Sequence, residues 1–271
     1  MRPAWSEAFE PDALKSISTL GLPSPITKEW AWAGATGAGV KVAVVDSGVD
    51  SDHPAVGGVA GAVALDYAPD TEELVSLEEG PHEDLFGHGT ACAGIIKKAA
   101  PDCELYSVRV LGKSLSGKGV VFARGLRWAI ENGMQVVNLS LSTSKKDFFD
   151  LFHELADEAY FHHMMLVSAI NNIKAPSYPS EYSSVFSVAA HKGQDPFSLF
   201  YNPSPPVEFG APGIDVEVAW ADKSYIKCTG NSFAAPHIAG LVARILSKHP
   251  GLTPFQMKTI LHSVADNAQA A

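Results

Sequence analysis

The chain has 271 residues, of which 46% are hydrophobic and 18% are charged, a composition typical of a globular protein with a large core. Its formal net charge of −10 argues against nucleic acid and against an anionic membrane surface as partners. The three cysteines, Cys92, Cys103 and Cys228, are an odd number at spacings that suit no metal site. We therefore expect reduced, buried thiols and no disulfide framework.

The amino-terminal segment carries no secretory signal, because it lacks a basic start followed by an apolar run. No stretch of the chain approaches the roughly 18 apolar residues of a membrane span. The sequence as given therefore predicts a cytoplasmic protein, and a domain cut from a longer precursor would look the same. The first 35 or so residues, punctuated by proline, predict an arm that packs on the domain that follows.

Strands and helices alternate along the rest of the chain. The continuous apolar run Val42 to Val45 follows a glycine-rich turn and predicts a strand buried on both faces of a parallel sheet. Residues 66–84 are acidic and irregular and predict a surface loop. The next predicted elements are a helix from 87, a strand at 104–110, a helix through 122–130, a strand at 135–141, a helix through 148–155, strands at 164–170 and 184–190, a hairpin ending at 228, and helices from 232 and 254. This alternation predicts a three-layer α/β/α fold whose mostly parallel central sheet has helices on both faces.

Three of these elements begin or end at side chains that can do chemistry. Asp46 ends the first apolar strand, His88 lies between two glycines at the start of a helix, and Ser232 lies where a loop runs into a helix. In such a sheet, functional groups gather beyond the carboxyl ends of the strands. A carboxylate, an imidazole and a hydroxyl together meet the requirement for nucleophilic acyl transfer, in which the base takes the hydroxyl proton and the acid orients the base.

Each of the three residues has a simpler interpretation when it is taken alone. Asp46 could cap the next turn, His88 could be a surface residue or a metal ligand, and Ser232 could be an ordinary helix N-cap. The other histidines show no HExxH pairing and no other zinc spacing. The combination of the three residues at element ends favours acyl transfer, and the sequence predicts neither a metal nor a cofactor.

The segments DSGVD around Asp46, HGTACAG around His88 and GNSFAAPHIAG around Ser232 resemble the three signatures of the subtilisin family, the subtilases. The order Asp, His, Ser along the chain is also that of the family. The similarity runs from about Leu22 to the last helix and includes VNLSLS, YPSEYSSVFSVAA and FGAPG. It implies an arm at residues 1–21, a subtilisin-like domain at residues 22–271, and a serine endopeptidase that works through an acyl-enzyme.

The resemblance also implies roles for further residues. Asn171 falls where the family has an asparagine that donates to the oxyanion, and Asn172 is a second candidate. Subtilases bind a peptide or protein substrate in extended form between two exposed strand edges. Ser140, Leu141 and Ser142 match one of these edges, and the turn near Ser116 and Gly117 leads the other.

Several positions depart from the family pattern. Ile170 and the pair Ser142–Thr143 stand where the family usually has glycines that line the first specificity pocket. Because these residues add atoms, we expect a shallower pocket that disfavours large aromatic residues before the cut. Asn231 replaces the usual threonine before the nucleophile, and Phe233 replaces the usual methionine after it; both changes are compatible with activity.

Two further departures concern missing segments. After HGTACAGII the chain passes through KKAAPD directly to the next strand, where secreted subtilisins carry a calcium-binding loop, so we expect no structural metal there. Only about 20 residues precede the family-like region. Either this enzyme folds unaided, or a segment that assists folding has been removed.

The leading hypothesis is a serine endopeptidase that selectively processes a precursor, for example by removing the leader of a ribosomally made peptide. Broad intracellular degradation is the alternative within the same chemistry. A catalytically silent binding module and a metal-dependent hydrolase are alternatives of other classes, which a fluorophosphonate probe and a chelator would separate from it. The sequence leaves open the natural substrate, the cut site, the oligomeric state, and whether the acyl group passes to water or to an amine.

Overall fold

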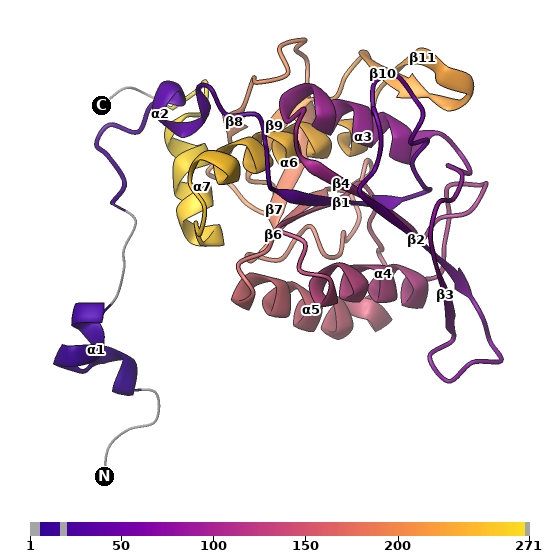
Figure 1. Cartoon of the computed structure of the whole chain (residues 1–271), viewed down its shortest axis with the longest axis horizontal. Helices are drawn as coiled ribbons and strands as arrows, with labels where there is room; N and C mark the ends of the chain where they lie inside the picture. The colour runs from indigo at the N-terminus through magenta and orange to yellow at the C-terminus, as the bar shows by residue number, and fades with distance from the viewer. Residues whose placement is uncertain (1–5, 17–20, 269–271) are drawn as a thin grey trace.

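The computed structural model describes residues 6–16 and 21–268 (Figure 1). Its centre is a nine-stranded sheet with the order β3-β2-β4-β1-β5-β6-β7-β9-β8. All neighbouring pairs from β2 to β9 in this order are parallel, and only the edge strands β3 and β8 pair antiparallel. The strands are β1 (Lys41–Asp46), β2 (Gly61–Tyr67), β3 (Val75–Glu79), β4 (Glu104–Arg109), β5 (Val136–Leu139), β6 (Met165–Ala169), β7 (Phe186–His191), β8 (Phe200–Tyr201) and β9 (Phe209–Pro212).

Helices cover both faces of the sheet, as Figure 1 shows. Helices α3 and α6 lie on one face, and α4 and α5 lie on the other. A separate two-stranded hairpin packs on α3. This arrangement confirms the predicted three-layer α/β/α fold. The helices are α1 (Pro11–Ser16), α2 (Lys28–Trp32), α3 (His88–Ala99), α4 (Gly119–Glu131), α5 (Phe149–Phe161), α6 (Asn231–Lys248) and α7 (Pro254–Ser263), the short 3₁₀ helices are η1 (Ser6–Phe9), η2 (Lys146–Phe148) and η3 (Ala221–Lys223), and the hairpin consists of β10 (Val216–Trp220) and β11 (Ser224–Cys228).

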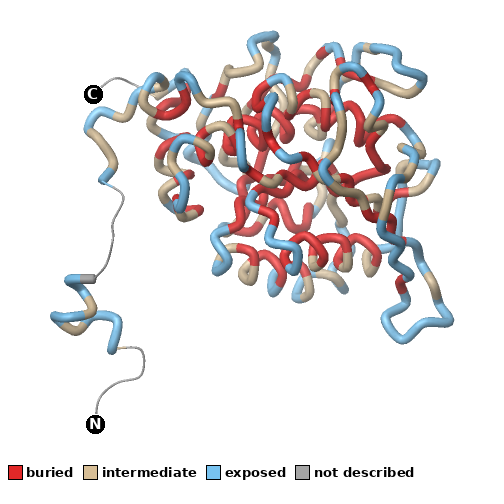
Figure 2. Tube along the Cα trace, in the orientation of Figure 1, coloured by how far each residue is buried: buried red, intermediate tan, exposed pale blue. Residues whose placement is uncertain are grey.

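The hydrophobic core has two halves, one on each face of the sheet. Val42 and Val44 of β1 belong to the half that α3 and α6 complete, whereas Ala43 and Val45 belong to the half under α4 and α5. Figure 2 shows this core as buried chain running through the sheet and its flanking helices. Because both faces are covered, the four residues between Lys41 and Asp46 in this strand are all apolar and buried.

The prediction of an irregular loop over residues 66–84 is wrong. The end of β2 and the whole of β3 form an antiparallel hairpin in this segment, with Asp66 opposite Ser76 and Tyr67 opposite Val75. Four of the five β3 residues are exposed, so its glutamates stay in water while the backbone pairs. The acidic composition concealed the strand, because exposed carboxylates are compatible with pairing at the edge of a sheet.

The amino-terminal segment divides into two parts. Helix α2 packs on α6 and buries Ala31 and Trp32. Helix α1 stands apart from the layered body in Figure 1. The boundary placed between residues 21 and 22 remains a prediction.

Candidate active site

The site is built at the carboxyl end of β1, where the strand order reverses and side chains can gather between neighbouring loops. Asp46, the last residue of β1, is completely buried, and its Oδ1 accepts a hydrogen bond of 2.7 Å from the Ser47 N–H. The chain then turns at Gly48, whose φ of +108° is in a region that favours glycine. A Cβ at Gly89 would lie 1.9 Å from the Gly48 carbonyl oxygen, so only glycine lets α3 approach this turn.

His88, the first residue of α3, lies between the other two predicted residues. Its Nδ1 is 2.9 Å from both carboxylate oxygens of Asp46, and its Nε2 is 3.0 Å from Ser232 Oγ. This geometry fits a neutral ring that donates its Nδ1–H to Asp46 and accepts the Ser232 hydroxyl proton at Nε2. Burial alone would lower the pKa of His88, but the Asp46 carboxylate raises that pKa well above 6.5.

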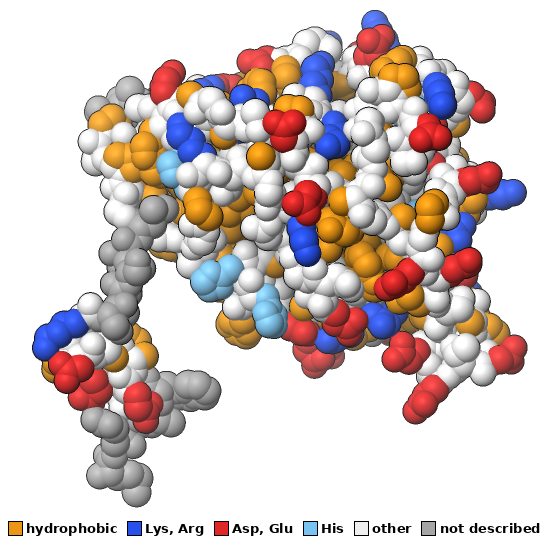
Figure 3. Space-filling view, viewed as in Figure 1, with side chains coloured by type: hydrophobic (Ala, Val, Ile, Leu, Met, Phe, Trp, Pro, Cys, Tyr) orange, Lys and Arg blue, Asp and Glu red, His pale blue; other side chains and the backbone are white. Residues whose placement is uncertain are grey.

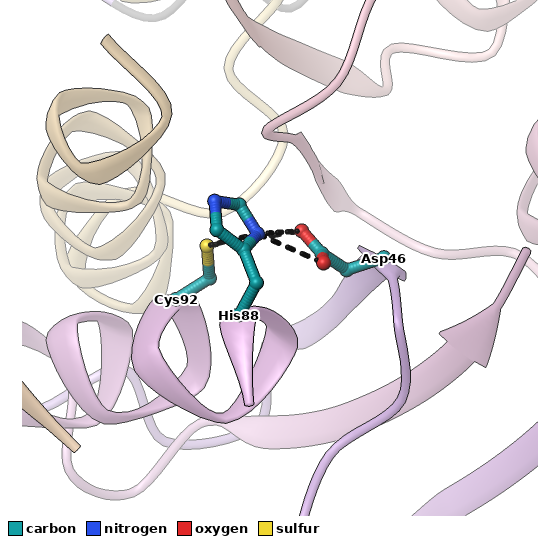
Figure 4. Close-up of side chains that lie close together, drawn as sticks. All are labelled: Asp46, His88 and Cys92. Atoms are coloured by element: carbon teal, nitrogen blue, oxygen red, sulfur yellow. Dashed lines mark hydrogen bonds and ion pairs between the residues drawn. The ribbon is translucent and has the colours of Figure 1, made fainter. Parts of the chain in front are cut away.

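Cys92 lies one helical turn after His88 and faces the same carboxylate (Figure 4). Its Sγ is 3.9 Å from Asp46 Oδ2 and 4.0 Å from His88 Nδ1. Burial raises the pKa of the Cys92 thiol and keeps it protonated. All three cysteines are free; Cys103 is buried as predicted, whereas Cys228 is only partly buried, so that prediction is wrong for Cys228.

Asp46, His88 and Cys92 each present one possible ligand atom, and these atoms lie within 4.8 Å of one another. A cation held there would have to displace the two hydrogen bonds that orient the imidazole. The arrangement therefore suits a hydrogen-bonded pair of Asp46 and His88 better than a metal site.

Ser232, the second residue of α6, is held by two neighbours. The hydroxyl of Ser140 donates a 2.7 Å hydrogen bond to the Ser232 carbonyl oxygen. The side-chain oxygen of Asn231 accepts from Ala190 N, and its side-chain nitrogen donates to the carbonyl oxygens of Ile170 and Asn171. Asn231 thus joins the start of α6 to the segment after β6, a role that the sequence did not suggest.

Asp84 is a second residue that the sequence analysis missed. Its Oδ1 accepts from Ser47 Oγ and from the N–H groups of Phe86 and Gly87, and its Oδ2 accepts from the N–H and the hydroxyl of Thr90. An acidic residue just before a helix stabilises the helix start. Here it also fixes the turn after Asp46, because Ser47 Oγ accepts from Gly89 N. The sequence does carry one signal for this role, because an acidic residue stands four positions before a histidine that is flanked by glycines.

A cleft of about 390 Å³ opens beside Ser232. The predicted substrate-binding residues Gly117, Ser140, Leu141, Ser142 and Ile170 all line it, together with both candidates for the oxyanion donor. It is lined by His88, Leu111, Leu115–Gly119, Phe122, Ser140–Thr143, Lys145, Ala169–Asn172 and Ser232. A larger cavity of about 630 Å³, near the start of β1, has none of the three reactive residues in its lining.

The two candidate oxyanion residues make different contacts. The side-chain nitrogen of Asn171 is 3.4 Å from the Pro176 carbonyl oxygen, a long contact that leaves the amide at the wall of the cleft. The side-chain oxygen of Asn172 accepts from Asn231 N at 2.9 Å. The oxygen of Asn172 therefore supports the start of α6, whereas Asn171 makes only the long contact with Pro176 through its side-chain nitrogen.

A buried carboxylate, an imidazole and a serine hydroxyl in one hydrogen-bonded chain define the class of serine hydrolases. The model of the Subtilase family, peptidase S8, matches residues 37–271. The chain therefore belongs to the subtilase family of serine peptidases.

The similar proteins agree with this assignment. The chain is 34% identical over 244 residues to a thermostable alkaline protease of Halalkalibacterium halodurans, covering 86% of this chain and 63% of that protein. It is 33% identical over 252 residues to subtilisin E of Bacillus subtilis, covering 86% of this chain and 62% of that protein. It is equally identical to a subtilisin of Bacillus pumilus, covering 86% of each chain. The chain thus spans less than two thirds of the length of the first two relatives.

A solved structure is similar as well. The crystal structure of a cold-adapted subtilisin-like serine proteinase superposes with a TM-score of 0.66 at 27% identity, covering 83% of this chain and 82% of that one. Within the described residues, no helix is both long enough and apolar enough to span a membrane.

Replacing Asp84 tests whether it holds the start of α3. We expect Asp84→Ala to lower the free energy of unfolding by about 0.5–2 kcal/mol, the usual cost of losing a helix cap. We expect Asp84→Asn, which keeps one acceptor oxygen, to lose less. Urea unfolding of both variants, with the exposed Asp52→Ala as a control, measures the effect. An Asp84→Ala protein as stable as the control would contradict the assignment.

Proposed function

We propose that this chain is a serine endopeptidase whose catalytic residues are Asp46, His88 and Ser232. The observation that carries the proposal is the continuous hydrogen-bonded chain from Asp46 through His88 to the Ser232 hydroxyl. Family membership supports it, because the same three residue types follow in the same order in subtilases.

The proposed reaction proceeds through an ester. His88 Nε2 takes the proton of Ser232 Oγ as this oxygen attacks the carbonyl carbon of the substrate, and Asp46 stabilises the resulting imidazolium. His88 then gives the proton to the leaving amine when the C–N bond breaks, which leaves an acyl-enzyme. Water loses a proton to His88 and attacks the ester, and Ser232 regains its proton as the acid product leaves.

The negative charge on the carbonyl oxygen needs donors in place before the reaction. We assign Asn171 Nδ2 and the Ser232 N–H to this role. The Ser232 N–H is one of the first N–H groups of α6, which have no acceptor inside the helix and lie at its positive end.

Peptide and protein substrates are proposed to bind in extended form along the cleft, between the segment of Ser140, Leu141 and Ser142 and the turn at Gly117. A Cβ at Gly117 would lie 2.5 Å from the Val110 carbonyl oxygen, so this turn needs glycine to keep its shape. We favour selective processing of a precursor over broad degradation. The reason is that the first specificity pocket has bulkier residues where the family usually has glycines, and these residues narrow it.

Labelling with a fluorophosphonate probe tests the nucleophile. We expect the wild-type chain to be labelled at Ser232, since only an activated hydroxyl reacts quickly, and Ser232→Ala to lose the label and the cleavage of a casein substrate. Ser263→Ala, which changes a serine in α7, should keep both. A chain that stays unlabelled would favour a silent binding module, and loss of cleavage in a chelator would favour a metal-dependent hydrolase.

The pH dependence tests the role of His88. Catalysis needs the neutral ring, so kcat/KM should fall as the pH drops through the pKa of His88, which lies well above 6.5. In Asp46→Asn, burial then dominates and lowers that pKa, so the acidic limb should move to lower pH, while the maximal rate falls by about 10⁴-fold. A profile of kcat/KM against pH for both proteins measures this. A wild-type limb with its midpoint below 6.5 would contradict the account.

The pocket prediction is tested with a peptide library cleaved by the wild type and by Ile170→Gly. We expect the wild type to disfavour Phe and Tyr before the cut, because Ile170 fills part of the pocket, and the variant to accept them better. A wild-type profile dominated by Phe or Tyr would contradict the shallow pocket.

A further inference from the structure

The segments that border the cleft have a charge opposite to that of the chain as a whole. Residues 111–119 contain two lysines, residues 140–146 two and residues 169–176 one, so there are five, and none of these segments contains Asp or Glu. The whole chain has 30 acidic residues against 20 Lys and Arg. The five are Lys113, Lys118, Lys145, Lys146 and Lys174, and all are exposed.

Two of these lysines, Lys118 and Lys145, line the same cleft as His88 and Ser232. In the part of the chain that the structure describes, none of the five lysines forms a salt bridge; the Lys and Arg residues that do form ion pairs lie in other segments. Lys118 Nζ lies 5.4 Å from the centre of the Tyr67 ring. The cleft therefore presents positive charge that no carboxylate among residues 6–16 and 21–268 neutralises by direct contact.

Acidic residues are concentrated in the segment of the β2–β3 hairpin, residues 66–84, which contains eight Asp and Glu. Figure 3 shows carboxylates gathered on this hairpin, where it projects from the body. Tyr67 brings the hairpin close to Lys118, so its carboxylates weaken the positive potential at Lys118. Lys145 lies in another segment, in which the next acidic residue along the chain is Asp147, so we expect Lys145 to keep more of its positive potential than Lys118 does.

We propose that the cleft selects peptides with Asp or Glu close to the cut bond, on the side that becomes the acyl group. This inference rests on the proposed endopeptidase function, because it assigns the charge of that enzyme's substrate. A peptide in the cleft lies between the segments that carry Lys118 and Lys145, so an acidic side chain projecting from it meets free ammonium groups.

The net charge of −10 would repel an acidic peptide at long range. At about 0.1 M salt, however, charges more than about 10 Å away are largely screened, so the lysines at the cleft decide the sign of the interaction. Exposed charge pairs of this kind change an equilibrium roughly two- to five-fold each. The preference should therefore be moderate and should shrink as salt rises.

The experiment uses matched peptides that differ only in Glu, Gln or Lys at one position, placed in turn at each of the residues before the cut. Cleavage of the Gln peptide by the wild type, and its absence with Ser232→Ala, first establishes the endopeptidase activity. We then expect the Glu peptide to have the highest kcat/KM at about 0.1 M salt and the Lys peptide the lowest, and we expect the difference to narrow as the salt concentration rises further.

Variants identify the residues responsible. We expect Lys145→Gln to reduce the ratio of kcat/KM between the Glu and Gln peptides more than Lys118→Gln does, and Lys145→Glu to reverse the preference towards the Lys peptide. Lys15→Gln, in helix α1 away from the body, is the matched control and should keep the wild-type ratio. Thermal unfolding of each variant checks that the fold is intact.

The outcomes separate the two proposals. If no peptide is cleaved, the endopeptidase function fails, and the charge preference fails with it. If the Gln peptide is cleaved but the Glu peptide is cleaved no faster at any position, or if Lys145→Glu leaves the ratio unchanged, only the charge preference is overturned.

Discussion

The hydrogen bonds between Asp46 and His88 are the interaction on which the rest of the site depends. Asp46 is completely buried, and a buried carboxylate costs on the order of several kcal/mol unless it is paired and hydrogen-bonded. The Ser47 N–H and the His88 ring supply those bonds. The same bonds fix the ring so that its other nitrogen faces Ser232, so one contact both compensates the burial of Asp46 and aims the base.

Three parts of the chain have to meet for this contact to form. The sheet places Asp46 at the end of a central strand. Gly48 and Gly89 let α3 come into contact with the turn that follows Asp46. Asp84 then ties the start of α3 to Ser47 through hydrogen bonds. On the other side, Ser140 and Asn231 hold the start of α6. The geometry of Asp46, His88 and Ser232 is therefore set in part by neighbours outside their hydrogen-bonded chain, as pre-organised sites require.

Much of this was predictable from the sequence, because its signals are local. The apolar run before Asp46 predicted a doubly buried strand, the proline after Thr253 predicted a helix start, and Thr253 does cap α7 with Gln256 completing the capping box. The sequence alone also predicted that Asp46, His88 and Ser232 lie at the ends of strands or helices and act together. Their assigned roles remain proposals that the chemistry must test.

The errors and omissions have two causes: composition that misled, and contacts between distant segments. The β2–β3 hairpin was missed because its acidic residues suggested a loop, whereas pairing at a sheet edge tolerates them. The bonds from Asn231 to the segment after β6, and the two lysines that line one cleft, depend on which loops the fold brings together. No periodicity or short motif encodes those distances.

The central claim is that folding makes one catalytic unit from Asp46, His88, Ser232 and an oxyanion donor. A crystal structure of the fluorophosphonate adduct tests this most directly. The account predicts phosphorus bonded to Ser232 Oγ, His88 still bonded to Asp46, and the phosphoryl oxygen within hydrogen-bond distance of Asn171 Nδ2 and the Ser232 N–H. An adduct on another residue, or a phosphoryl oxygen that faces away from Asn171 towards a different donor, would contradict it.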